Sequence, residues 1–548
     1  MPVHGVFQPL PSPDGQSIIF TALGDLWLRH AEGRIEQLTS GPEDDADPAW
    51  SPDGRSICFV SSRSGDYQVW VLNLVDRTKR QVTSTLGNAE RPLWHPSGES
   101  IVFVQGPRPQ WGDTLSVVPA AGGTPRAIVK TTGMDVRPLG WLPGDQSLVY
   151  SELHYDEKAS ETKGRIQRVR MDGSSLSMAA DPPGQFEFAA LSPKADRLAY
   201  VSHGELWTRP LAVGAVDQRL ALGPAFFPAW SSSGHMLYVR AGELMRSDAH
   251  TGEEQQLPLD LSYKVPRSGS LFLRNARLLT PEPREGLWDL LLEGGRIQTI
   301  VRAGEPPGKA DRVLDLEGRT VIPGLLALHE HIFRGFPAEG YLYWGVTSLA
   351  AAGDQGHWSV SQQEAIRSGR RAGPRIFPAG GFVVPSYMNA FPQFLRVETP
   401  EHLERYLDHL KGLGATQVKA YLRRDPWVEA ATVSSAHRRG LPVLSHFLRP
   451  ASVAAGLDRK EHAFYYTWDG AATARFQQDV IEIMRRGRIT LDPTLVWAFA
   501  ETEAGHARWK EALARTEISS FLVPSDLNFV RSQVEKPAPP EMEYERTL

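Results

Sequence analysis

The chain has 548 residues, of which 41% are hydrophobic and 22% charged, and its formal net charge is −5. This length suggests about three folding units, and the composition excludes a disordered, collagen-like or multi-span membrane protein. The mildly negative charge indicates no general affinity for nucleic acid or anionic lipid.

The amino terminus lacks a basic start followed by an apolar run, so no signal peptide is expected there. We therefore expect a cytoplasmic protein, with export after removal of a leader as the alternative. The single cysteine, Cys58, excludes an intramolecular disulfide and a cysteine-rich metal site. A metal ion would need histidine, carboxylate or modified lysine ligands.

A turn of the type Ser-Pro-Asp-Gly recurs in the first half, with versions that begin at residues 12, 51, 95, 142, 192 and 231. Proline presets the first turn dihedral and glycine supplies a positive one, so each turn can close a hairpin. A period of about 40–50 residues with four short strands is typical of one propeller blade. The pattern predicts a six-bladed β-propeller over residues 1–264, with a generic all-β sandwich as the alternative. This segment resembles the TolB-type, WD40-like propellers.

A short polar joint follows, and then three apolar runs at residues 271–279, 287–292 and 296–301. The turn Glu293-Gly294-Gly295 joins the last two runs as a hairpin. The pattern predicts a small antiparallel sheet.

From residue 319 onwards, apolar strand runs alternate with helical stretches, which indicates β/α units around a parallel sheet. The helices are expected at residues 401–412, 428–439 and 477–486. Seven alternating strands predict a (β/α) barrel, in which the chemistry lies at the carboxyl ends of the strands. These strands are expected at residues 325–328, 347–351, 376–378, 417–421, 443–446, 460–464 and 489–492.

Four histidines and one lysine fall at or near such strand ends. His329 and His331 are two positions apart, so their rings should point to one side and could clamp a divalent metal; two polar loop histidines are the alternative. Lys419 lies within an apolar strand, where a charged, unpaired amine is costly. Because lysine can lose its proton when buried, a neutral amine with a chemical task is expected, with a buried ion pair as the alternative. His446 and His462 end the next two strands.

Residues 321–331, 345–348, 373–376, 418–419, 446 and 461–462 resemble the amidohydrolase superfamily, in particular its imidazolonepropionase-like or prolidase-like branch, including members fused to TolB-type propellers. The resemblance implies a TIM-like barrel over residues 321–548 and a small β-sandwich over residues 265–320.

The resemblance also implies a ligand set. His329 and His331 would bind a first metal ion, Lys419 carboxylated by CO₂ would bridge two ions, and His446 and His462 would bind the second. One or two divalent ions are therefore expected, with Zn first and Mn, Co or Fe also compatible with nitrogen and oxygen ligands. The implied reaction is attack of metal-activated water on a carbon–nitrogen bond.

The chain departs from the family where a catalytic Asp would be expected, at the end of an eighth strand. No Gly-Thr-Asp triplet follows residue 492, so we expect a barrel that lacks its last β/α unit. A fragment of a longer enzyme and a degenerate relative are both open explanations. Asp526, Asp492 and His357 are candidates for the missing base, and Tyr387 is a candidate for substrate binding.

The sequence thus predicts a metal-dependent hydrolase of amide, cyclic amide or dipeptide-like bonds. Its partner would be a small-molecule or short-peptide substrate, with no nucleic acid and no membrane, and a homo-oligomer is compatible with the sequence. The alternative is a catalytically impaired or truncated relative that acts as a propeller-based binding protein.

Overall fold

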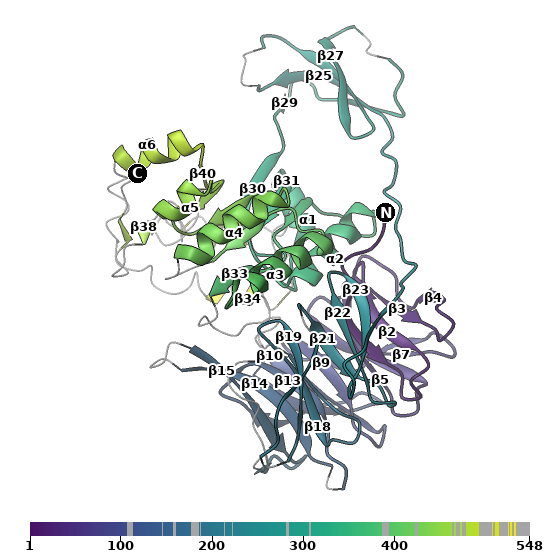
Figure 1. Cartoon of the computed structure of the whole chain (residues 1–548). Helices are drawn as coiled ribbons and strands as arrows, with labels where there is room; N and C mark the ends of the chain where they lie inside the picture. Colours follow the sequence, from purple (N-terminus) through teal and green to yellow (C-terminus); the bar gives the residue numbers. More distant parts are fainter. Residues whose placement is uncertain are drawn as a thin grey trace.

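The structure is a computed structural model of the whole chain (Figure 1). It describes residues 1–106, 113–144, 146–156, 161–176, 186, 188–212, 214–221, 223–280, 284–305, 308–385, 394–421, 426–462, 465–466, 472–473 and 478–492, and scattered residues between 507 and 532.

The first half forms six four-stranded antiparallel sheets within the described residues, and each sheet consists of four consecutive strands. The first strands of neighbouring sheets contact one another, and β1 also contacts β21, so the sheets close a ring as the blades of a propeller do (Figure 1). The strands are β1 (Phe7–Pro11), β2 (Ile18–Ala22), β3 (Asp25–Arg29), β4 (Ile35–Gln37), β5 (Asp45–Trp50), β6 (Ser56–Ser61), β7 (Gln68–Asn73), β8 (Lys79–Gln81), β9 (Asn88–Trp94), β10 (Ser100–Gly106), β11 (Thr114–Pro119), β12 (Arg126–Lys130), β13 (Met134–Trp141), β14 (Leu148–Asp156), β15 (Glu161–Val169), β16 (Ser175–Leu176), β17 (Phe188–Leu191), β18 (Arg197–Ser202), β19 (Glu205–Pro210), β20 (Gln218–Ala221), β21 (Phe226–Trp230), β22 (His235–Arg240), β23 (Glu243–Asp248) and β24 (Glu254–Leu257).

The sequence repeat has a direct structural cause. In the first turn the Ser12 hydroxyl donates to the Asp14 carboxylate (2.5 Å), and Gly15 adopts a positive φ of 73°. The tryptophan before the next turn links one sheet to the previous one, because Nε1 of Trp50 donates to the Leu10 carbonyl (3.2 Å). Trp141 and Trp230 make the same kind of bond to the sheets before them.

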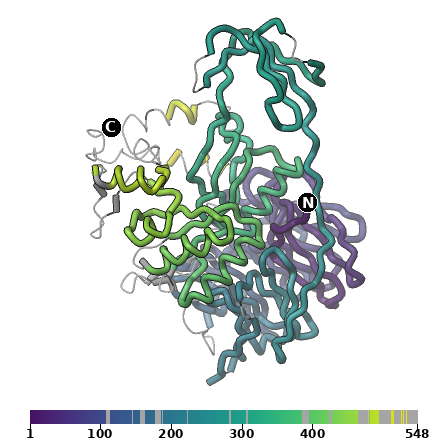
Figure 2. The backbone as a smooth tube through the Cα atoms, turned by 45° about the horizontal axis from the view of Figure 1, so that its top comes forward, coloured from purple at the N-terminus to yellow at the C-terminus, as the bar shows by residue number. Residues whose placement is uncertain are grey.

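The amino terminus is fixed to the segment that leaves the last sheet. Pro2 pairs with Ser262 in an antiparallel bridge, and the Val3 amide donates to the Leu261 carbonyl (3.2 Å). Figure 2 shows the two segments side by side. This contact brings together chain segments that lie on either side of all six sheets.

Residues 271–321, between the propeller and the β/α part, form one five-stranded sheet. This sheet stands apart from the propeller (Figures 1 and 2). Its order is β27-β26-β25-β28, with β29 also paired to β25. The β-sandwich implied by the family resemblance is not formed here, because the described residues supply a single layer and leave apolar side chains such as Ile297 and Val313 exposed. The strands are β25 (Leu271–Leu278), β26 (Trp288–Glu293), β27 (Arg296–Arg302), β28 (Arg312–Asp315) and β29 (Thr320–Val321).

The second half alternates strands and helices, as the sequence predicts. Its strands form two parallel sheets, β30-β31-β32 and β34-β33-β35-β36-β37-β40, with β38 and β39 as a separate pair. Within the described residues β30 and β40 each pair on one side alone, so the strands do not close into a full barrel there. The strands are β30 (Leu325–Glu330), β31 (Val346–Ala351), β32 (Arg375–Pro378), β33 (Phe382–Pro385), β34 (Phe394–Val397), β35 (Val418–Ala420), β36 (Val443–Ser445), β37 (Arg459–Glu461), β38 (Tyr465–Tyr466), β39 (Ala472–Thr473) and β40 (Thr490–Asp492).

The helices are α1 (Ala338–Tyr343), α2 (Gly356–Arg367), α3 (Pro400–Leu413), α4 (Pro426–Arg438), α5 (Pro450–Ala454) and α6 (Gln478–Gly487). Helix α3 illustrates the local signals: Thr399 caps it by accepting from the His402 amide (3.2 Å), and Gly414 ends it with a φ of 93°. None of the helices described here has the length and apolar character needed to cross a bilayer.

The propeller and the β/α part share hydrophobic core. Phe7 and Ala46 of the propeller pack with Ile332, Leu349 and Trp358 of the β/α part in one buried cluster. A second cluster joins Phe226 and Met236 of the propeller to Leu403, Tyr406 and Leu410 of α3. Helices α2 and α3 accordingly lie against the propeller (Figure 1). Two buried apolar clusters of this kind oppose independent motion of the two parts.

Candidate metal centre

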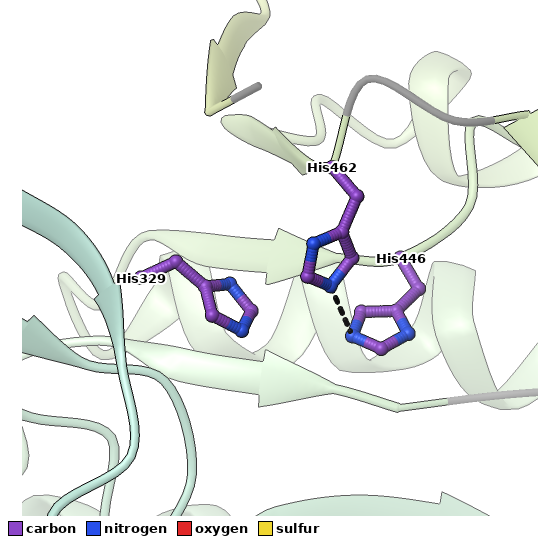
Figure 3. Close-up of side chains that lie close together, drawn as sticks. All are labelled: His329, His446 and His462. Atoms are coloured by element: carbon purple, nitrogen blue, oxygen red, sulfur yellow. Dashed lines mark hydrogen bonds between the residues drawn. The ribbon is translucent and has the colours of Figure 1, made fainter. Parts of the chain in front are cut away.

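Three of the predicted histidines meet at the carboxyl ends of their strands (Figure 3). His329 lies in β30, His446 directly follows β36, and His462 directly follows β37. One ring nitrogen of each lies within 4.8 Å of the others, and Nε2 of His462 is 3.1 Å from Nε2 of His446. Three converging imidazoles can hold a divalent metal ion.

A buried carboxylate sets the orientation of His329. Glu461, the last residue of β37, contacts Nδ1 of His329 and also accepts from Nε of Arg459 (2.6 Å). Burial alone would oppose ionisation of Glu461, but the His329 bond and the charges of Lys419 and Arg459 hold the pKa of this carboxyl below its ordinary value. An ionised Glu461 accepts a proton-bearing Nδ1, which leaves Nε2 of His329 available to a metal ion.

His331 lies beside this group without belonging to it. Its ring is 5.1 Å from the ring of His329, and it packs near Phe333 (5.9 Å) and Phe382 (5.7 Å). Nδ1 of His331 bonds to the Gly353 carbonyl (2.9 Å), so Nε2 carries the free lone pair. Burial lowers the pKa of His331 to about 4, which keeps the ring neutral at pH 7.

Lys419 is fully buried in β35, and within the described residues its Nζ makes no hydrogen bond. Burial lowers the pKa of Lys419 to about 7; the charges of Arg459 and Lys460 act in the same direction, and Glu461 acts against them. A buried amine without a partner is costly. The Lys419 amine is therefore chemically suited to carboxylation and metal binding, the role that the family resemblance implies.

Two residues of this region were not predicted from the sequence. Glu461 orients His329, and Nζ of Lys460 donates to the backbone carbonyls of Glu461 and His462, the latter at 2.9 Å. His462 has a left-handed φ of 63°, a conformation that is strained for this residue type. Lys460 thus stabilises the bend that carries a candidate ligand. The available signal was Lys460-Glu461, two successive charges at the start of the strand expected at residues 460–464.

The candidates for the missing base have different outcomes. His357 lies in α2 at the contact with the propeller, where its ring packs on Phe226 (4.8 Å) and Phe227 (5.5 Å) rather than on the three histidines. Asp492 ends β40 and lies opposite Glu461 in the parallel register. Asp526 and the proposed substrate contact Tyr387 lie outside the described residues.

The protonation state of the histidine ligands indicates which metal ion they suit. Burial keeps the pKa of His446 well below its ordinary value and lowers that of His462 to about 3, so both rings are neutral ligands at pH 7. Neutral imidazoles beside a near-neutral amine suit Zn or a similar first-row ion.

Comparison with known proteins gives a domain match and two short similarities. The family model of the TolB beta propeller domain matches residues 4–195. The imidazolonepropionase of Klebsiella pneumoniae (strain 342) is 45% identical over 69 residues, which are 11% of this chain and 16% of that protein. The dihydroorotase of Syntrophus aciditrophicus (strain SB) is 36% identical over 63 residues, which are 11% of this chain and 15% of that protein.

The matched segments therefore span about one sixth of the length of these curated relatives. Among solved structures, a Xaa-Pro dipeptidase with bound methionine in the active site has a TM-score of 0.36 and 18% identity, over 48% of this chain and 74% of that one. The match over residues 4–195, together with the four-stranded antiparallel sheets found there, identifies the N-terminal part of the chain as a TolB-type β-propeller domain.

Proposed function

We propose that this protein is a metal-dependent hydrolase of carbon–nitrogen bonds. The observation that carries the proposal is the group of three histidines whose ring nitrogens lie within 4.8 Å of one another, with the buried amine of Lys419 near enough to act electrostatically on His446 and His462. The short sequence similarities to an imidazolonepropionase and a dihydroorotase support the same class of enzyme.

The residues divide into ligands and supports. Nε2 of His329, together with His446 and His462, would hold the ion, and Lys419 would join them as a carbamate formed with CO₂. Zn is the first expectation, and a bound ion of this class polarises a carbonyl and activates water at neutral pH. Glu461 fixes the tautomer of His329 through Nδ1.

The substrates we propose are amides, cyclic amides and short peptides of small size. His331 and Phe382 lie next to the histidine group, with ring centres 5.7 Å apart, and provide an aromatic surface beside it. The unprotonated Nε2 of neutral His331 can accept a hydrogen bond from an amide N–H or serve as a further ligand.

A propeller-based binding protein is the second candidate. The observation that favours it is the open parallel sheet, in which β30 and β40 each pair on one side alone within the described residues. In that case the β/α part would be structural and the propeller would contact the ligand or partner.

Metal analysis of the purified full chain tests the proposal. We expect about one or two equivalents of a first-row ion after loading with Zn²⁺ and CO₂, and loss of the ion in the Lys419→Ala/His446→Ala variant. The control is His437→Ala, which removes an outer histidine of α4 that pairs with Asp458 (2.8 Å). Wild-type protein that stays metal-free would overturn the hydrolase proposal and favour the binding role. A metal-loaded chain is then assayed on amides, cyclic amides and dipeptides.

A further inference from the structure

The innermost strands of the propeller carry one recurring irregularity. Five of them are interrupted by a shift of register, and a residue with a left-handed φ between 49° and 55° lies at each shift: Gln8, Asp47, Arg91, Asp135 and Phe227. A β-bulge of this kind re-aims the side chain of the extra residue. The side chain at the same position of the inner strand is therefore re-aimed in these five sheets.

Four of these residues form a chain of polar contacts from sheet to sheet. Nε2 of Gln8 donates to Asp47, the Arg91 amide donates to Asp47 (3.2 Å), and the Arg91 guanidinium pairs with Asp135. Asp135 also accepts from Nε of Arg137 (2.9 Å). The bulge residues thus create a charged network at the inner strands of the propeller.

One residue of the β/α part enters this network. Arg334 forms a bidentate pair with Asp47, at 2.6 Å for Nη1 and 2.7 Å for Nη2, and its Nη1 lies 3.3 Å from Glu90. The Arg334 side chain is 6% exposed, and those of Asp47 and Glu90 are 9% and 4% exposed. A two-point guanidinium–carboxylate bond fixes orientation as well as distance.

Arg334 belongs to the loop that follows β30, three residues beyond His331. The propeller holds this loop at a second point, because the Gly335 amide donates to the Tyr67 hydroxyl (3.1 Å). Between His331 and Arg334, Ile332 is buried against Phe7 and Ala46 of the propeller. The backbone that leaves the histidine strand is therefore packed and hydrogen-bonded to propeller residues.

We propose that Arg334 is a positioning residue through which the propeller fixes the loop after β30 and, with it, His329 and His331. The propeller then serves as a structural part of the candidate metal centre. The part of this inference that concerns metal binding rests on the proposed function, whereas the part that concerns the loop does not.

The chain offers a matched control at the same interface. Nη1 of Arg370 pairs with Asp25 of the propeller at 2.6 Å, and this ion pair also joins the two parts. Arg370 precedes β32 in the chain, so it lies at the amino ends of the strands, whereas Arg334 follows a carboxyl end. Arg370→Met therefore removes another ion pair between the same two parts without changing a residue of the loop after β30.

The first measurement is hydrogen–deuterium exchange of the peptide 329–337 in the full chain, without metal. We expect Arg334→Met to accelerate exchange roughly tenfold or more. Arg334→Lys keeps the buried charge but loses the bidentate bond, so it should fold normally and give an intermediate rate. Arg370→Met should leave this peptide at the wild-type rate. Wild-type rates in both Arg334 variants, or equal acceleration in Arg370→Met, would overturn the inference.

The second measurement is Co²⁺ binding, followed by the visible absorption spectrum and by titration. We expect an altered spectrum and roughly tenfold weaker binding in Arg334→Met, with the wild-type spectrum and affinity in Arg370→Met. If exchange accelerates in Arg334→Met but Co²⁺ binding does not change, the loop does not position the ligands and this part of the inference fails. If wild-type protein binds no Co²⁺, the proposed function fails, and the exchange comparison still decides whether Arg334 fixes the loop.

Discussion

The carboxylate of Glu461 contacts Nδ1 of His329, although the two residues are 132 positions apart in the sequence. This contact joins the ends of β37 and β30, which lie in different sheets. Because Glu461 is ionised and accepts the proton-bearing nitrogen, it decides which nitrogen of His329 faces the other two histidines.

Glu461→Gln should weaken metal binding about 10–100-fold, because a neutral amide orients and polarises His329 less well than a carboxylate. The free energy of unfolding should also fall by about 2 kcal/mol, since the buried bond to Arg459 loses its charge. Isothermal titration with Zn²⁺ and urea denaturation measure the two effects.

Glu482→Gln is the matched control for this variant. Glu482 bonds to Arg485 (2.7 Å) and Arg486 (2.6 Å) on the exposed face of α6, so its replacement should leave both quantities at their wild-type values. Equal metal affinity in wild type and Glu461→Gln would contradict the role of Glu461.

Lys419→Met should have opposite effects on stability and on metal binding. In chelator the variant should be more stable by about 1–3 kcal/mol, because a buried amine that makes no hydrogen bond to any described residue is replaced by an apolar side chain of similar length. Its affinity for Zn²⁺ should fall at least about tenfold because a ligand is lost. Denaturation in chelator and metal titration test both effects, with the exposed Lys411→Met as control. A loss of stability in chelator would show that the amine has a partner.

The propeller could be predicted because its signal is local and repeated. The turn residues set their own hydrogen bonds, and tryptophans such as Trp50 link each sheet to the previous one at a constant spacing. The short strand β33 was not predicted, because Phe382–Pro385 is only four residues long.

The candidate site could be predicted only in part, because its remaining features depend on docking between distant segments. Strand ends identified His329, His446 and His462, which the structure brings together. The predicted strand ends did not indicate that α2 packs on the propeller, where His357 contacts Phe226 and lies away from the histidine group. The role of Glu461 as the partner of His329 was not predicted, because this contact joins residues 132 positions apart in the sequence.

Gly5→Ala should disturb the contact between the propeller and α2. An added Cβ would lie 2.3 Å from the Ser361 amide nitrogen and 2.5 Å from its Cα, so backbone must move. We expect a loss of about 1–3 kcal/mol in the free energy of unfolding. In the control Gly487→Ala, the atoms nearest to the new Cβ are side-chain atoms of Ile489 and Val453, at 3.2 Å or more, and the effect should be smaller. Wild-type stability of Gly5→Ala in urea denaturation would contradict this tight packing.

Glu364, at the same contact between the propeller and α2, should make the free energy of unfolding depend on pH. It lies in α2 and accepts from the amides of His4 (2.8 Å) and Gly5 (3.0 Å), while burial raises the pKa of this carboxyl to about 7. The unfolded chain has the ordinary pKa near 4.3, so between these values the folded protein binds the extra proton. Stability therefore falls as pH rises from about 4 through about 7, and it levels off above.

Glu364→Gln removes this titration, and the comparison with wild type cancels the contributions of other groups. We expect the free energy of unfolding of the variant to rise relative to wild type by about 3 kcal/mol between pH 4.5 and pH 8. One hydrogen bond to the His4–Gly5 backbone is lost at every pH, which shifts the whole curve of the variant but not its slope. Urea denaturation at several pH values gives the two curves. Parallel curves would contradict the raised pKa, because a carboxyl with the same pKa in both states adds no slope.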